Sequence, residues 1–238
     1  MKPVPLTIEN RWDILYRDFP EIYDEFAAVP KEPRLLPVLT KRFDFQDKVV
    51  ADIGSGSGAS SFEFARLAKK VIGVEIEDAM RELAEREAIR RGLSNLEFVK
   101  GDARNIPLDD NSVDIVTAIT LALYPVEEYR QFAAEAMRVT ANRGWIVMIN
   151  ITPGWYGGEL SNIIADVDTI EIKQNAIFVD EFGFRYEDFE AVQEYGSLDK
   201  IIRTYGFIFG KKVIDYLRET GKTNIKWKFR IHSLNVEK

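Results

Sequence analysis

Short apolar runs alternate with longer amphipathic segments between residues 49 and 151. The runs are rich in Val and Ile, and the segments between them place apolar residues at helical spacing. The pattern predicts strands over residues 49–53, 71–76, 96–100, 113–119 and 144–151, and helices over about 59–68, 78–91 and 126–139. Strands that alternate with helices of this length indicate βαβ units, so we expect a parallel sheet covered by helices on both faces.

The pattern changes on both sides of this region. Residues 1–47 predict helical pieces interrupted by prolines, and residues 198–219 predict a long helical region. Residues 225–234 alternate strictly between apolar and polar positions. Strict alternation is typical of a strand with one solvent-facing side, so we expect this strand to be antiparallel and near the sheet edge. His232 is expected on its wet face, without a catalytic role.

Residues 153–197 interrupt the alternation of strands and helices. They carry ten acidic and two basic residues together with eight aromatic ones. A connection of this length within one domain is more typical of a functional lid than of a passive loop. Two interpretations remain open. Aromatic faces with carboxylates can hold an amine or another cation, or the rings bury the lid on the domain while the acids face water, which is the more ordinary arrangement.

The chain therefore predicts a single domain over residues 1–238, because its length suffices for one α/β domain with an elaboration. We expect an N-terminal helical cap over residues 1–47 and a cofactor-binding core over residues 48–151. The acidic aromatic lid follows over residues 153–197, and a C-terminal helix and strand over residues 198–238.

Composition narrows the class of protein. The chain is 46% hydrophobic and 30% charged, as in soluble globular domains, and it has neither an apolar run of membrane-spanning length nor a signal-peptide pattern. We therefore expect a cytoplasmic protein without a membrane partner. The lack of Cys and the single His exclude a Cys-held or His-based metal site. The net charge is -7 and there is no basic stripe, which argues against a nucleic-acid partner.

A glycine-rich loop, GSGSGA, follows the first predicted strand at residues 54–59. Glycines at a strand-to-helix turn allow a cofactor to approach the bare backbone. The spacing fits the pattern G-x-G-x-G and also the dinucleotide pattern G-x-G-x-x-G/A. A tight turn without a ligand is the third interpretation, and the loop alone does not choose among the three.

Three carboxylates lie at the ends of three successive predicted strands. Asp52 stands two residues before the first glycine, Glu75 ends the second strand, and Asp102 follows the third. We expect them to form one site, because the carboxyl ends of parallel strands meet at one edge of a sheet. A carboxylate at Asp52 would repel a pyrophosphate but would suit a ligand with a positive centre. Glu75 is placed to accept both hydroxyls of a ribose, and Asp102 to accept from an adenine amine.

Taken in order, these motifs resemble those of a known family. VVADIGSGSG, VIGVEIED, FVKGDARNIPLDDNSVDIVTAI and GWIVMI, all within residues 48–151, are similar to the successive motifs of the class I S-adenosylmethionine-dependent methyltransferases of the small-molecule type. The resemblance implies a Rossmann-like α/β fold with a mostly parallel seven-stranded sheet, helices on both faces, one antiparallel strand and a lid insertion after the fifth strand. It also implies that S-adenosyl-L-methionine lies across the carboxyl ends of the strands.

Carried over position by position, the resemblance implies a set of cofactor-binding residues. Asp52, Gly54, Ser55, Gly56 and Gly58 would line the methionine part, Glu75 would hold the ribose, and Asp102 with Ala103 would hold the adenine. Ala118 and Ile119 would back the methionine moiety, and Ile76, next to Glu75, is also expected to bind the cofactor. The cofactor has a positive sulfonium and no phosphate, which agrees with a site furnished with carboxylates. Asp114 corresponds to an acid that in this family is mainly scaffold.

The sequence offers no dedicated catalytic side chain. Methyl transfer to a nucleophile can proceed by positioning and desolvation. Tyr124 is the candidate for contact with the acceptor, and packing under the following helix is the alternative for its ring. The N-terminal cap supplies candidates to close over the cofactor, namely Arg11, Trp12 and Tyr16.

These observations predict a methyltransferase that acts on O, N or C of a small, neutral or cationic acceptor. Two alternatives remain open. One is a NAD(P)-dependent oxidoreductase that uses the glycine loop for a dinucleotide, against which Asp52 and Asp102 argue. The other is a protein that binds S-adenosylmethionine without catalysis.

Overall fold

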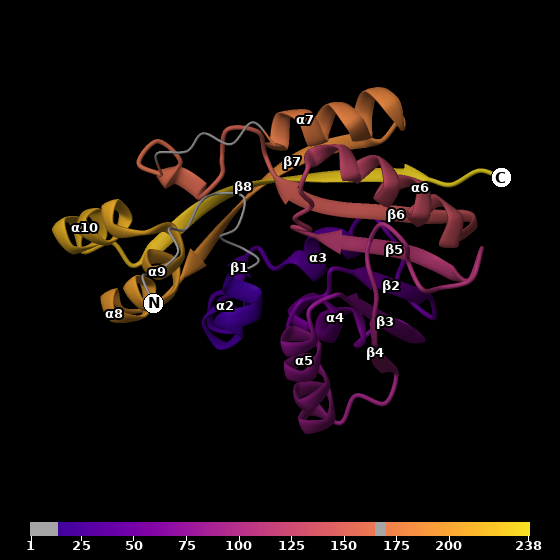
Figure 1. Cartoon of the computed structure of the whole chain (residues 1–238), viewed down its shortest axis with the longest axis horizontal. Coiled ribbons are helices and arrows are strands. Elements are labelled where there is room, and N and C mark those ends of the chain that lie inside the picture. Colours follow the sequence, from indigo (N-terminus) through magenta and orange to yellow (C-terminus); the bar gives the residue numbers. More distant parts are fainter. Residues whose placement is uncertain (1–13, 165–169) are drawn as a thin grey trace.

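The computed structural model describes residues 14–164 and 170–238 (Figure 1). Within these ranges, eight strands form one sheet in the order β1-β7-β8-β6-β5-β2-β3-β4. The strands are β1 (Lys31–Glu32), β2 (Val49–Ile53), β3 (Lys70–Glu75), β4 (Leu96–Lys100), β5 (Val113–Ile119), β6 (Thr140–Ile151), β7 (Arg185–Glu194) and β8 (Asn224–Asn235). Neighbours among β2 to β6 pair in parallel, whereas β8 runs antiparallel to both β6 and β7.

Helices cover both faces of this sheet. They are α2 (Pro20–Ala27), α3 (Leu35–Thr40), α4 (Ala59–Phe64), α5 (Asp78–Arg91), η1 (Val126–Glu128), α6 (Tyr129–Val139), η2 (Gly158–Leu160), α7 (Ile170–Ala176), η3 (Ile177–Glu181), α8 (Leu198–Ile201), η4 (Ile202–Gly206), α9 (Phe207–Phe209) and α10 (Lys211–Thr220). Figure 1 shows α6 and α7 on one side of the sheet and α4 and α5 on the other. Successive strand residues accordingly enter different apolar clusters, Val71 the one with α4 and Ile72 the one with α6. The predicted α/β class is confirmed.

The predicted elements of the central region are present. Helix α5 has the predicted bounds, and Gly92 ends it in a left-handed conformation with φ of 67°. Asp114 has a scaffold position, because its Oδ2 accepts the N–H of Val49 at 2.8 Å and ties β5 to β2. The seven-stranded sheet with one antiparallel strand is present, and the two-residue β1 adds an eighth strand. None of the helices in the described ranges combines the length and apolarity needed to cross a bilayer.

One strand lies inside the segment interpreted as a lid. Residues 185–194 form β7, which pairs with β8 along its whole length, so they belong to the sheet. The acids that obscured the strand pattern face bases on β8. Asp188 pairs with Arg230 at 2.7 Å, and Glu190 pairs with Lys226 at 3.6 Å. Such cross-strand pairs stabilise a sheet, and they arise from a partner strand that the local sequence does not contain.

Two predictions about β8 were wrong, namely its place near the sheet edge and the exposure of His232 on a wet face. This strand is antiparallel as expected, but it lies between β6 and β7 rather than near the edge. His232 is only 2% exposed and is not on a wet face. Its ring packs against Phe178 of η3, with ring centroids 5.4 Å apart, because the segment after residue 170 covers this side of the strand.

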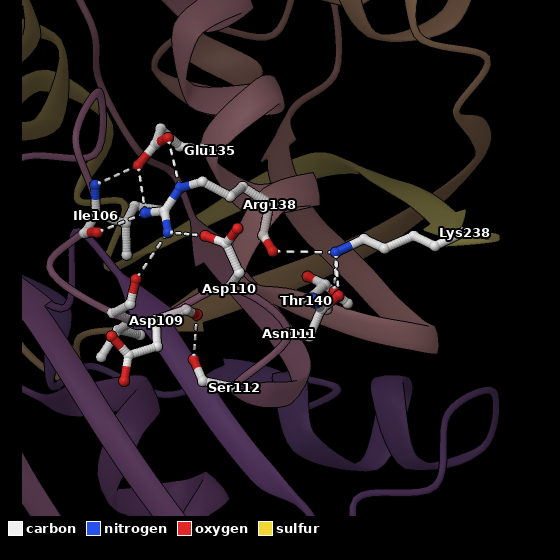
Figure 2. Close-up of polar contacts among 10 residues, drawn as sticks. Ile106, Asp109, Asp110, Asn111, Ser112, Glu135, Arg138, Thr140 and Lys238 are labelled. Carbon is white, nitrogen blue, oxygen red and sulfur yellow. Dashed lines mark hydrogen bonds and ion pairs between the residues drawn. The ribbon is translucent and has the colours of Figure 1, made fainter.

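A polar cluster fixes the amino-terminal ends of β5 and β6 (Figure 2). Arg138 of α6 donates to the backbone oxygens of Ile106 and Leu108 at 2.8 and 2.9 Å, and it pairs with Asp110 and Glu135 at 2.7 Å. The guanidinium thus joins the loop before β5 to the helix before β6. Figure 2 also shows the Nζ of Lys238 beside these ends, where it donates to the Thr140 oxygen at 2.7 Å.

We predict that Arg138→Ala lowers the free energy of unfolding by about 2 kcal/mol, because it removes charge-assisted hydrogen bonds to two backbone oxygens. Urea denaturation followed by circular dichroism measures the change. Arg90→Ala is the matched control, since the Arg90 side chain is 71% exposed and pairs with Glu87 on the surface of α5. Equal losses of stability in the two variants would contradict the role of Arg138.

Candidate functional site

The glycine loop connects β2 to α4 with backbone conformations that favour glycine. Gly54 and Gly56 have φ values of +69° and +55°. A Cβ atom at Gly54 would lie 2.6 Å from Cδ1 of Leu121, so the Leu121 side chain packs closely against the loop at this glycine. The loop therefore presents bare backbone beside the carboxyl end of β5.

Glu75, at the carboxyl end of β3, joins this loop to the next turn. Its Oε2 accepts the N–H of Gly56 and its Oε1 accepts the N–H of Glu77, both at 2.8 Å. The carboxylate is 7% exposed. Burial raises the pKa of Glu75, and the backbone N–H groups oppose that shift. A carboxylate oxygen accepts more than one hydrogen bond, so both oxygens retain capacity toward a ligand hydroxyl.

A cavity of about 280 Å³, called here the loop cavity, opens in front of Glu75. Its wall includes Gly54, Gly56, Ile76, Asp102, Ala103, Ile119 and Tyr124 among the residues assigned to the cofactor or acceptor. The ionisable acids in the wall are Glu75, Glu77, Asp102 and Glu128, and the arginine is Arg104. This balance of charge favours a ligand with a positive centre and opposes a pyrophosphate.

Asp52 lies behind the loop. It is 1% exposed and does not line the loop cavity. Its Oδ2 accepts from the hydroxyls of Ser60 and Ser61 at 2.8 and 2.6 Å, and its Oδ1 accepts from Thr117 at 2.9 Å. The carboxylate therefore ties the start of α4 to β5, and a cofactor contact for Asp52 stays a prediction.

Asp102 lies in the wall of the loop cavity, but its carboxylate is engaged by Arg104. Its Oδ1 accepts the backbone N–H of Arg104 at 2.8 Å and the Nε–H at the same distance. The Arg104 side chain holds the pKa of Asp102 below its usual value and also binds Glu128 at 2.8 Å. A ligand amine would have to share Asp102 with this arginine.

The other residues predicted to bind the cofactor do not line the loop cavity. Ser55 lines a larger cavity of about 580 Å³ on the other side of the loop, called here the basic cavity. Its wall holds five bases (Lys31, Arg34, Arg66, Arg90, Arg91) against three acids (Asp24, Glu63, Glu87). Gly58 precedes α4, and Ala118 is 1% exposed in the core; neither lines the loop cavity.

The N-terminal cap, residues 1–47, supplies two tyrosines to the loop cavity. The rings of Tyr16 and Tyr23 meet edge to face with centroids 4.8 Å apart. Burial and the charge of Glu75 raise the pKa of Tyr23 to about 12, so its hydroxyl is neutral at ordinary pH. Tyr16 was a candidate from the sequence and Tyr23 was missed, although it follows Tyr16 by seven residues, which is helical spacing. Arg11 and Trp12 lie outside the described residues.

A third cavity of about 100 Å³ adjoins the loop cavity, and we call it the aromatic cavity. The two cavities share Tyr16, Tyr23, Thr120, Leu121, Ala122 and Tyr124. The rest of its wall comes from distant segments: Phe26, Lys31, Tyr129, Asn150, Ile151, Tyr156, Glu171, Gln174, Trp227 and Phe229. Apart from Tyr124, the sequence had not assigned any of these residues to an acceptor, because no local motif unites segments so far apart.

Thr120 lies where the cavities meet. It follows β5 directly and lines the loop, aromatic and basic cavities. Its φ of +52° is unusual for a β-branched residue, and its N–H donates to the Ile149 oxygen at 2.6 Å. Strained backbone of this kind clusters at functional sites, which marks the end of β5 as the centre of the candidate site.

A chain of amide and imidazole groups supports one side of the aromatic cavity. Gln174 donates to Oδ1 of Asn150 at 3.3 Å, and Nδ2 of Asn150 donates to Nδ1 of His232 at 3.4 Å. Nε2 of His232 then donates to Oδ1 of Asn175 at 3.1 Å. This pattern requires a neutral imidazole, and burial, assisted by Arg230, lowers the pKa of His232 to about 4. The chain connects α7 to β6 and β8.

The central region of the chain is similar in sequence to known methyltransferases. Residues 51–148 match the sequence model of the family described as "Methyltransferase domain". The chain is 31% identical over 101 residues to the uncharacterized methyltransferase YcgJ of Bacillus subtilis. This alignment covers 42% of this chain and 40% of that protein. It is 30% identical over 134 residues to the phthiotriol/phenolphthiotriol dimycocerosates methyltransferase of Mycobacterium tuberculosis, with coverage of 55% and 47%. The alignments thus span less than half the length of each relative.

Solved structures share the fold over more of the chain. The crystal structure of YcgJ superposes with a TM-score of 0.60 at 21% identity and covers 85% of this chain and 97% of that one. A SAM-dependent methyltransferase from Aquifex aeolicus superposes with a TM-score of 0.53 at 16% identity, over 98% of this chain and 100% of that one.

Residues 51–148 thus match a methyltransferase domain, and the fold of the chain is that of S-adenosylmethionine-dependent methyltransferases. The cofactor of this family is S-adenosylmethionine, and the acidic wall of the loop cavity fits its positive charge. A NAD(P)-dependent oxidoreductase finds no support in these comparisons.

We predict that His232 makes stability depend on pH. Its pKa is about 4 in the folded chain against about 6.5 when unfolded, so the unfolded state takes up the proton first as pH falls. Stability contributed by the neutral ring is complete above about pH 7 and is lost between about pH 6.5 and pH 4. The loss amounts to about 2 kcal/mol by pH 5.

Urea denaturation at pH 7.5 and pH 5, on the natural chain and on His232→Gln, isolates this contribution. The carboxylates contribute equally to both proteins, so the variant should lose less stability than the natural chain by about 2 kcal/mol. The same loss in both proteins would show that His232 does not set the pH dependence.

Proposed function

We propose that this protein transfers the methyl group of S-adenosylmethionine to O, N or C of a small, neutral or cationic acceptor. The observation that carries the proposal is the continuity of two cavities. The loop cavity has a carboxylate-rich wall, and it adjoins an aromatic cavity of the size of a small molecule across the shared wall from Thr120 to Tyr124.

In this proposal the residues of the loop cavity hold the cofactor. Glu75 would accept the ribose hydroxyls with the capacity left after its two backbone hydrogen bonds. Ile76, Asp102 and Ala103 would surround the adenine, and Gly54 and Gly56 would allow the methionine part to lie against backbone. The cofactor supplies a methyl group on a positively charged sulfur, which leaves as a neutral thioether.

The chain would then contribute orientation and exclusion of water. Tyr16 and Tyr23 are half-buried beside the glycine loop, and they would shield the reacting groups from solvent. Tyr124 lies in the wall that both cavities share, so its ring would contact the acceptor beside the cofactor. Desolvation of a neutral nucleophile costs less than that of an anion, which favours neutral or amine acceptors in an aromatic cavity.

We predict that Glu75→Gln weakens binding of S-adenosylmethionine about 10- to 100-fold, because an amide NH₂ would replace one oxygen and would face a backbone N–H. Titration calorimetry measures the dissociation constant. Glu82→Gln is the matched control, because Glu82 is exposed on α5 and outside the loop cavity.

Two outcomes contradict the proposal at different levels. If the natural chain does not bind S-adenosylmethionine at about millimolar concentration, the proposed function fails. If Glu75→Gln binds as tightly as the natural chain, the function stands but the assignment of Glu75 fails. Methyl transfer from labelled cofactor to pools of small acceptors then separates an enzyme from a protein that only binds the cofactor.

A further inference from the structure

One arginine joins two carboxylates in the wall of the loop cavity. The guanidinium of Arg104 donates from Nε and Nη2 to Asp102, and from Nη1 to Oε1 of Glu128 at 2.8 Å. All three side chains line the loop cavity. Asp102 follows β4 and Glu128 ends η1, directly before α6, so the guanidinium bridges two segments that are distant in the sequence. The bridge lies where Asp102 is proposed to meet the adenine.

This bridge uses the acceptor capacity of Asp102. A carboxylate has about four lone-pair positions. Oδ1 accepts the backbone N–H and the Nε–H of Arg104, both at 2.8 Å, and Oδ2 accepts from Nε at 3.0 Å and from Nη2. An adenine amine can therefore donate to Asp102 only where the Arg104 side chain gives up part of this contact.

Glu128 offers the guanidinium a second place. Its Oε1 accepts one hydrogen bond from Arg104, and within residues 14–164 and 170–238 no group donates to its Oε2. A guanidinium forms a two-bond contact with one carboxylate at a time, because its donors have a fixed fork geometry. Arg104 and Glu128 are 36% and 21% exposed in their side chains, so water screens both pairs and the exchange from Asp102 to Glu128 costs little.

The group that faces the base decides which base the cavity prefers. Adenine has an exocyclic amine that donates, and hypoxanthine has at the same position a carbonyl oxygen that accepts. A carboxylate, which only accepts, favours the amine, whereas a guanidinium, which only donates, favours the carbonyl oxygen. Asp102 and Arg104 thus have opposite preferences, and the contact between them sets the balance.

We propose that Arg104 sets the preference of the loop cavity for adenine by competing with the adenine amine for Asp102. Without a ligand the guanidinium holds Asp102. When the nucleoside binds, the guanidinium turns to Glu128 and leaves the Asp102 carboxylate to the amine. Arg104 is therefore a specificity-determining residue, and Glu128 acts through it. The proposal deepens the proposed function and rests on it, because it concerns the nucleoside of the same cofactor.

Adenosine and inosine, titrated by NMR into the natural chain and into Arg104→Met, test this competition. The variant should bind adenosine about 5-fold more tightly, because the amine no longer displaces a cation from Asp102, and it should bind inosine no more tightly than the natural chain does. A purely structural role of Arg104 would weaken the binding of both nucleosides. Arg130→Met is the matched control, because Arg130 pairs with Glu181 at 2.6 Å and lies outside the loop cavity. It should leave both affinities unchanged.

Glu128→Gln gives a test with the opposite sign. It removes the second carboxylate, so the guanidinium keeps Asp102, and adenosine should bind about 5-fold more weakly while inosine is unaffected. Glu127→Gln is the matched control, because Glu127 is the exposed neighbour outside the loop cavity. The double variant Arg104→Met with Glu128→Gln should bind adenosine as Arg104→Met does, because Glu128 acts only through Arg104.

Three results would overturn the inference: Arg104→Met binds adenosine no more tightly than the natural chain, inosine gains as much as adenosine, or the double variant loses the gain. Calorimetry with S-adenosylhomocysteine on the natural chain distinguishes this failure from that of the proposed function. If the natural chain binds S-adenosylhomocysteine and the variants show one of the three results, the role of Arg104 alone is wrong. If the natural chain binds neither S-adenosylhomocysteine nor adenosine, the proposed function is wrong as well.

Discussion

The candidate site depends on one buried carboxylate that two backbone segments share. Glu75 accepts N–H groups from the glycine loop after β2 and from the turn after β3, so the two loops are held together by one side chain. Parallel pairing of β2 with β3 brings the loops to the same edge of the sheet. A negative charge is thereby fixed next to glycine backbone, and the loop cavity forms around it. The charge explains why a cation suits this cavity and a pyrophosphate does not.

The second half of the chain adds much of the wall of the aromatic cavity, the proposed site of the acceptor. Strand β8 lies between β6 and β7 and contributes Trp227 and Phe229, while α7 contributes Glu171 and Gln174. The neutral His232 links the two elements through amide side chains. The core of the methyltransferase fold thus carries the loop cavity, the proposed site of the cofactor, and the C-terminal strands and α7 close the aromatic cavity beside it.

Local sequence was sufficient for the features whose cause is local. The alternation of strands and helices, the bounds of α5 with its stop at Gly92, the left-handed glycines and the place of Glu75 all follow from residues adjacent in the chain. Asp52 shows the limit, because its orientation depends on hydroxyls from α4 and β5 that only the fold brings together. Strand β7 was missed for the same reason, since the bases that balance its acids lie on β8. The aromatic cavity could not be predicted, because its wall unites segments more than two hundred residues apart.

The most direct measurement of the central claim is a crystal structure of the protein with S-adenosylhomocysteine. We expect the nucleoside in the loop cavity, with both ribose hydroxyls within about 3 Å of the Glu75 carboxylate. We also expect the sulfur to face the shared wall at Thr120 and Tyr124, with the aromatic cavity left beside it for the acceptor. A nucleoside in the basic cavity, or a ribose that does not touch Glu75, would contradict the role proposed for the loop cavity.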